Sequence, residues 1–149
     1  MKSVDEIIYD AICADTAIME AIGSRVVSTC FEVPPAEADN TPLPNIIVTD
    51  DGFQNQVGSK DCVWESGEDR VQATVDVAAD SPKEVKRLIR MVRRAIENQI
   101  ILMSANNERI PELESLSSGG LAWDWMKPCY YQHLTYQCTT LSDIDNEQD

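Results

Sequence analysis

A strand followed by a capped helix, in residues 70–98, most constrains what this chain can fold into. From Arg70 to Val77 polar and apolar residues alternate, which is typical of a strand with one face on a core and the other in water. Residues 81–84 (Ser-Pro-Lys-Glu) then supply an N-cap hydroxyl, a proline at the first helical position and a carboxylate three residues after the cap. The helix is predicted to run to about Asn98. Its predicted buried face is Val85, Leu88, Ile89, Val92, Ala95 and Ile96.

A second capped helix is predicted near the start of the sequence. Ser3 and Glu6 repeat the capping arrangement, because a hydroxyl is again followed by a carboxylate three residues later. Asp15 is expected to cap a shorter helix that ends at Gly23. The apolar residues at helical spacing in these two segments are Val4, Ile7, Ile8, Ala11, Ile12, Ile18, Met19 and Ile22.

The remaining pattern indicates strands joined by turns. Strands are predicted at 25–33, 46–48, 62–65, 121–126 and 129–139, with a weaker indication around Leu113 and Leu116 and a loop or hairpin excursion at 51–61. Strands that follow one another after short turns pair antiparallel. The sequence therefore predicts an α+β fold, a mostly antiparallel sheet with two main helices packed on one face as a two-layer sandwich.

The length and the C-terminal composition define the predicted domain organisation. A chain of 149 residues fits one domain, and no linker divides it, so we predict a single α+β domain over residues 1–141. Residues 142–149 contain four acids and no aromatic residue, which predicts an acidic disordered tail.

The net charge excludes several classes of partner. The chain has 12 basic and 26 acidic residues, a formal net charge of −14. This excess opposes general or sequence-specific nucleic-acid binding and binding to an anionic membrane surface, both of which need basic surfaces. No apolar run approaches the ~18 residues of a membrane-spanning helix. An odd number of cysteines, five, without short paired spacing favours a reduced, intracellular compartment over a disulfide framework.

Motifs for covalent chemistry are absent from the sequence, so we predict neither an enzyme nor a cofactor. There is no phosphate-binding glycine loop and no nucleophile elbow, and His133 is the single histidine. Cys129, His133 and Cys138 lack the paired spacing of structural zinc sites, and alternation along a strand would place Cys138 on the opposite face. With 26 acidic residues in the chain, a pair such as Asp50-Asp51 is expected by chance, so we assign it no role. Such a pair could bind magnesium weakly.

The distribution of charge gives the candidate interaction site. Residues 82–98 hold six basic and two acidic residues, a net charge of +4, which leaves −18 on the rest of the chain. At about 100° per residue the basic side chains form a stripe opposite the predicted buried face. This basic stripe is Lys83, Lys86, Arg87, Arg90, Arg93 and Arg94. A solvated helix face is one interpretation, and a docking surface for an acidic partner, of which a second copy of this chain is the nearest, is another. A nucleic-acid groove is a third interpretation, which the charge of −18 around the stripe opposes.

Several segments occur in the order found in a known family. They include a helix, an Ala14-Asp15 pair, the run Gly23-Ser24-Arg25-Val26, a Leu43-Pro44 strand, and the strand 70–78 followed by the capped helix from Ser81. In this order the chain resembles, over residues 4–98, the tail-completion and tail-terminator proteins of long-tailed bacteriophages and prophages. It departs from that family at Ala78, where an aromatic residue is common, and in the length of the 51–61 excursion.

The resemblance implies a virion protein at the head–tail interface, made in the cytoplasm of the bacterial host. Such a protein forms a ring, commonly a hexamer, that caps the tail tube and docks to the head connector, so its partners are its own copies, the tail tube protein and connector or neck proteins. A connector stopper is a related alternative. The alternative from another class is a small acidic intracellular protein-binding module or regulator that acts as a monomer or dimer.

Overall fold

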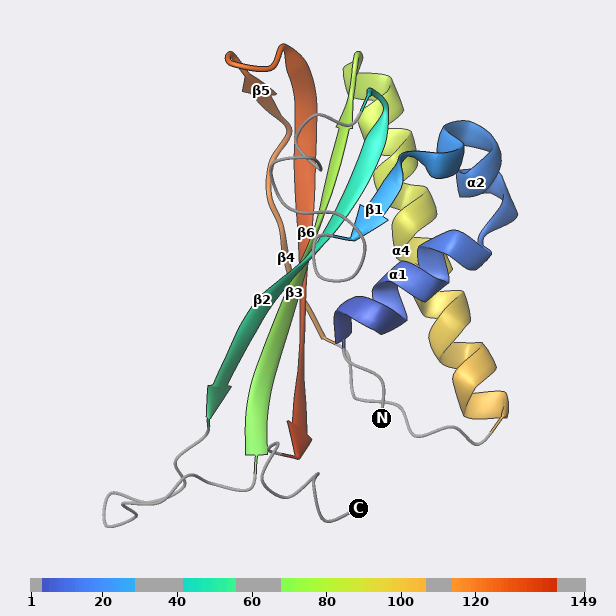
Figure 1. Cartoon of the computed structure of the whole chain (residues 1–149), viewed down its shortest axis with the longest axis vertical. Coiled ribbons are helices and arrows are strands. Elements are labelled where there is room, and N and C mark those ends of the chain that lie inside the picture. Colours follow the sequence, from blue (N-terminus) through green and yellow to red (C-terminus); the bar gives the residue numbers. More distant parts are fainter. Residues whose placement is uncertain (1–3, 29–41, 56–67, 107–113, 142–149) are drawn as a thin grey trace.

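The computed structural model describes residues 4–28, 42–55, 68–106 and 114–141 of the chain. Two helices and a short 3-10 helix come first, and one long helix separates the early strands from the late ones (Figure 1). In chain order the elements are α1 (Val4–Ala14), α2 (Thr16–Ile22), η1 (Gly23–Arg25), β1 (Val26–Ser28), β2 (Asn45–Asn55), β3 (Glu68–Ala79), α4 (Pro82–Ala105), β4 (Glu114–Ser118), β5 (Ala122–Asp124) and β6 (Cys129–Leu141).

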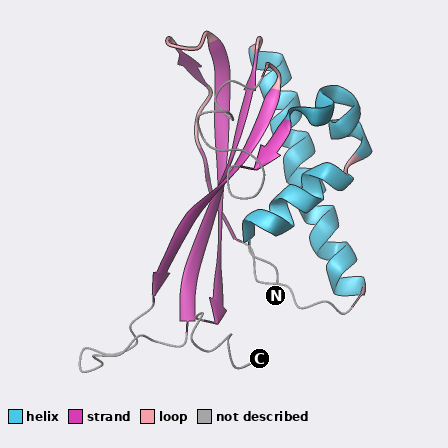
Figure 2. Ribbon diagram, viewed as in Figure 1, coloured by secondary structure: helices cyan, strands magenta, loops and turns pink. Residues whose placement is uncertain are grey.

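The strands form one sheet with β3 at its centre. The strand order is β1-β2-β3-β6-β4, and β5 pairs with the first part of β6. All pairs are antiparallel except β1 with β2, which run parallel with Val26 opposite Ile46. The helices all lie on one face of this sheet (Figure 2). The chain is therefore α+β, as the alternating strands and the two capped helices predict.

The core lies between α4, α1 and the helix-facing side of the sheet. Ala73, Val75 and Val77 alternate along β3, and each is fully buried. The six residues predicted for the buried face of α4 are all buried, and Val4, Ile7, Ile8, Ala11 and Ile12 of α1 are buried as well. The predicted helical and strand periods thus identify the two surfaces that pack together.

Two of the three predicted helix caps are present, and the third, at Ser3, lies outside the described residues. The Asp15 carboxylate accepts a hydrogen bond of 3.0 Å from the Ile18 amide, and Gly23 ends α2 at φ 56°, where glycine is favoured. The Ser81 hydroxyl accepts a hydrogen bond of 3.3 Å from the Glu84 amide at the start of α4. These caps satisfy amides that have no partner inside the helix.

Several predicted boundaries are wrong. The strand predicted at 121–126 is β5 (Ala122–Asp124), which leaves Trp125 and Met126 in a turn, and the two largest shifts are at the ends of β2 and α4. β2 continues through residues 51–55, which were predicted to be a loop, because an irregularity between Asp50 and Phe53 interrupts the alternation without ending the strand. At this irregularity Gly52 adopts φ 86° and its amide donates to the Asp50 carboxylate at 2.7 Å. α4 continues beyond Asn98 to Ala105, although Ile101 and Leu102 point away from the core and break the pattern.

Other predictions fall partly or wholly beyond the described ranges. β1 covers the beginning of the strand predicted at 25–33, and its residues from 29 onward lie outside the described residues, as does the strand predicted at 62–65. The acidic segment 142–149 also lies outside them, so the domain boundary at residue 141 stays a prediction.

Candidate functional site

The basic stripe lies on the outer face of α4. Its six members are all exposed, whereas the six residues of the predicted apolar face of the helix are buried. This segregation follows from the period of the helix, since residues three and four apart share a face. The structure thus brings together every residue predicted for the candidate interaction site.

Most of the charge on this stripe is not neutralised by near neighbours. Arg87 pairs with Glu84 across one turn, with Nη2 and Oε1 separated by 2.8 Å. Within the described residues, no carboxylate forms an ion pair with Arg90, Arg93 or Arg94. These three arginines therefore present guanidinium groups with which an acidic partner can pair.

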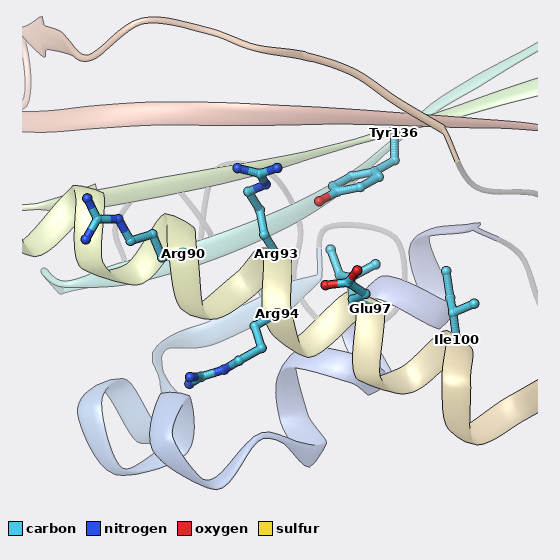
Figure 3. Close-up of a pocket in the computed structure, with 7 residues that line it drawn as sticks. Arg90, Arg93, Arg94, Glu97, Ile100 and Tyr136 are labelled. Carbon is cyan, nitrogen blue, oxygen red and sulfur yellow. The ribbon is translucent and has the colours of Figure 1, made fainter.

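An open groove of about 420 Å³ adjoins the stripe (Figure 3). We call it the arginine groove, and it is lined by Arg90, Arg93, Arg94, Ile96, Glu97, Ile100 and Tyr136. The Tyr136 ring projects from β6 toward α4, with its hydroxyl near Arg93 and Glu97. Burial raises the pKa of Tyr136, an effect that Arg93 opposes and Glu97 reinforces. The phenol therefore stays neutral at physiological pH and can donate a hydrogen bond.

An exposed aromatic tip is the feature that the sequence analysis missed. It lies where β5 turns into β6 and comprises Leu121, Trp123, Trp125 and Met126, all of which are exposed. Trp125 is 85% exposed and Met126 97% exposed. Two large apolar residues in a turn before Lys127-Pro128 were the available signal, because turns are ordinarily polar.

The residues considered for metal binding do not converge. Cys129 and His133 lie on one face of β6 and Cys138 on the other, as alternation predicts. Of the predicted acidic pair, Asp50 accepts from the Gly52 amide and Asp51 accepts from the Thr74 hydroxyl. Among the residues that the structure describes, no group of three or more His, Cys, Asp or Glu side chains could hold a metal ion.

Stability should fall at alkaline pH because of Cys138. Burial raises the pKa of the Cys138 thiol to about 11 from its ordinary value of 9.0. The unfolded chain therefore loses this proton first, so the stabilisation is complete below pH 9 and is lost as the pH rises through 11. Urea unfolding of the wild type and of Cys138→Ala will test this. The wild type should lose more stability than the variant between pH 9 and pH 11, and equal losses would contradict the assignment.

Two segments that carry the family resemblance meet in the structure. The Arg25 guanidinium donates a hydrogen bond of 2.9 Å to the carbonyl oxygen of Leu43, which precedes the cis peptide bond to Pro44. The neighbouring residues Val26 and Ile46 pair in the parallel β1–β2 ladder. Arg25 and Leu43 therefore have a structural role, since they fix β1 beside β2.

The comparisons with known proteins bear on the fold. The sequence matches no protein-family model, and no curated protein is similar to it. Among solved structures, the chain is similar to a chain of the "Virion of native gene transfer agent (GTA) particle". The TM-score is 0.50 at 12% sequence identity, over 94% of this chain and 96% of that one. The likeness extends over nearly the whole of both chains and defines a shared α+β fold. In the described part of this chain no helix is both long and apolar enough to cross a membrane.

Proposed function

We propose that this chain is a structural protein of a phage or phage-like virion, and that it acts as a ring-forming tail terminator or tail-completion protein at the head–tail interface. The observation that carries the proposal is the fold likeness to a virion chain over 94% and 96% of the two lengths. The ordered segments in residues 4–98 that resemble the tail-terminator family support the more specific role.

The charge distribution supplies a mechanism of assembly. The exposed basic stripe of one copy meets an acidic surface of the next copy, because the chain outside residues 82–98 carries −18. A contact between two different surfaces is heterologous, and such a contact builds a ring when its repeated rotation closes on the first copy. The ring then caps the tail tube by occlusion and docks to the connector. This mechanism uses no covalent chemistry, and an acidic lumen would repel DNA and so let it slide.

The solution mass and the capping of tail tubes test the proposal together. Light scattering over a wide concentration range, with and without magnesium, should show a closed species near six times 16.6 kDa, about 100 kDa. Added to polymerising tail tube protein, the chain should stop growth, so that electron microscopy shows shorter tubes with one end capped.

The rival interpretation predicts a different pair of results. A small acidic binding module would remain a monomer or dimer at all concentrations and would leave the lengths of the tubes unchanged. Those two results together would contradict the terminator proposal. A capped tube without a free ring would retain the proposal and indicate that the ring forms on the tail.

A further inference from the structure

Exposed apolar surface is confined to two places in the described residues. One is the aromatic tip, and the other is the last part of α4, where Ile101 is 63% exposed and Leu102 54% exposed. In Figure 1 β5 and the end of α4 lie at opposite ends of the long axis. The tip gathers four such side chains in one place, and a cluster of this kind marks an interaction site more often than scattered side chains do.

Hydrogen bonds and ring contacts restrain the backbone and the tryptophans of the aromatic tip. Asp124 accepts hydrogen bonds from the Met126 amide at 3.0 Å and the Lys127 amide at 3.4 Å. Trp123 packs edge-on against Tyr130, with ring centroids 4.8 Å apart, and against Trp125 at 6.3 Å. A preorganised tryptophan loses little conformational entropy on binding, and tryptophan is enriched among the residues that dominate interface energy.

The arginine groove has the chemistry to receive such a tip. Ile96 and Ile100 give it apolar lining, and Arg90 and Arg93 supply guanidinium groups that stack on an indole face. Its volume of about 420 Å³ lies within the range of small-molecule sites. Exposed Ile101 follows one turn after Glu97 and extends the apolar surface of the groove along α4.

The charges around the aromatic tip and the arginine groove also complement each other. Asp80, Asp124 and Lys127 lie near the tip, since all three act on the Cys129 thiol at the start of β6. After the larger effect of burial, the two carboxylates raise the pKa of this thiol and Lys127 lowers it. The groove has three arginines against one glutamate, Glu97. The two acids outnumber the one lysine beside the tip, and this acidic excess complements the excess of guanidinium groups beside the groove.

Tip and groove of one copy are too far apart to meet. Tyr130 packs against the tip, and Tyr136 of the groove lies six residues further along β6, about 20 Å at the rise of a strand. We propose that the aromatic tip of one copy, led by Trp125 and Met126, seats in the arginine groove of a second copy. This proposal rests on the proposed ring-forming function. It adds to that function by specifying the two surfaces that meet between neighbouring copies.

The experiment measures self-association of the full chain by light scattering and sedimentation. Trp125→Ala with Met126→Ser should weaken the association at least tenfold, about the effect of losing one anchor residue. The matched control is Leu102→Ser, which removes an exposed apolar side chain at the end of α4 outside the groove lining and should change nothing. Circular dichroism will establish that the variants keep the wild-type fold.

Arg93→Ala, on the groove side of the contact, should also weaken association and keeps the proposal testable if the tip variant folds poorly. Where Trp125→Ala and Arg93→Ala both keep the fold, a double-mutant cycle measures the coupling between them. Direct contact predicts that the double variant weakens association by less than the product of the two single effects, whereas effects that multiply would overturn the contact. Unchanged association of the tip variant would also overturn it while leaving the ring intact. Loss of tube capping with retained association would assign the tip to the tail tube instead. A chain that never self-associates would overturn the contact. The proposed function would then be tested separately, by whether the chain still caps growing tail tubes.

Discussion

Reversing the charge of Arg87 and Arg90 should weaken self-association at physiological salt and leave the monomer folded. Both side chains are exposed on the outer face of α4, away from the core. A glutamate at each position would set like charges against the acidic surface of the neighbour, which costs several kcal/mol at an interface. We expect association to weaken at least tenfold, and more at low salt, where screening is weaker.

The cost of this double variant to folding should be small. Arg87→Glu exchanges the exposed ion pair with Glu84 for a repulsion across one turn of helix, worth a few tenths of a kcal/mol. Arg90 has no ion pair among the described residues, so its replacement breaks none there. The melting temperature of the monomer should therefore stay near that of the wild type.

Arg70 offers the matched control for this charge reversal. It is exposed on β3, on the face of the sheet that alternation turns away from the helices. Arg70→Glu and Arg90→Glu change the net charge equally, but only the second alters the basic stripe. Light scattering should show normal association for Arg70→Glu and weakened association for Arg90→Glu. Normal association of the Arg87, Arg90 double variant would contradict the role of the stripe.

The parts of the fold that the sequence predicts are those governed by local rules. Ser81 and Asp15 are capping residues with a fixed relation to the amide that they bind, and the burial of Val75 and Leu88 follows from the periods of strand and helix. The basic stripe could be found because its members share one helix. Each of these inferences needs only a few consecutive residues.

The features that were missed depend on residues distant in sequence or on a local break in the pattern. The arginine groove needs Tyr136 of β6 beside Arg93 of α4, a proximity that only the assembled sheet creates. Gly52 interrupts the alternation of β2, so the pattern indicated a loop where pairing with β3 in fact continues. The sequence alone does not distinguish an exposed Trp125 from a buried one, because its exposure depends on the turn in which it lies.

The largest loss of monomer stability should come from Leu88→Ala. Leu88 is 0% exposed, on the face of α4 that packs on the sheet. Truncation removes buried methyl groups and leaves a cavity, which costs about 2–5 kcal/mol, a large part of the 5–15 kcal/mol that stabilises an ordinary domain. Leu102→Ala is the matched control, because the same substitution occurs in the same helix at a residue 54% exposed.

Helix propensity changes equally in the two leucine variants, so their difference isolates the effect of burial. Urea unfolding must be measured at concentrations where the chain is monomeric, since assembly stabilises the folded state by mass action. Leu102→Ala should shift the free energy of unfolding by less than about 0.5 kcal/mol. Similar losses in both variants would mean that this face of α4 is not the core. A selective loss in Leu88→Ala would mean that the basic stripe and the arginine groove are held in place by the packing beneath them.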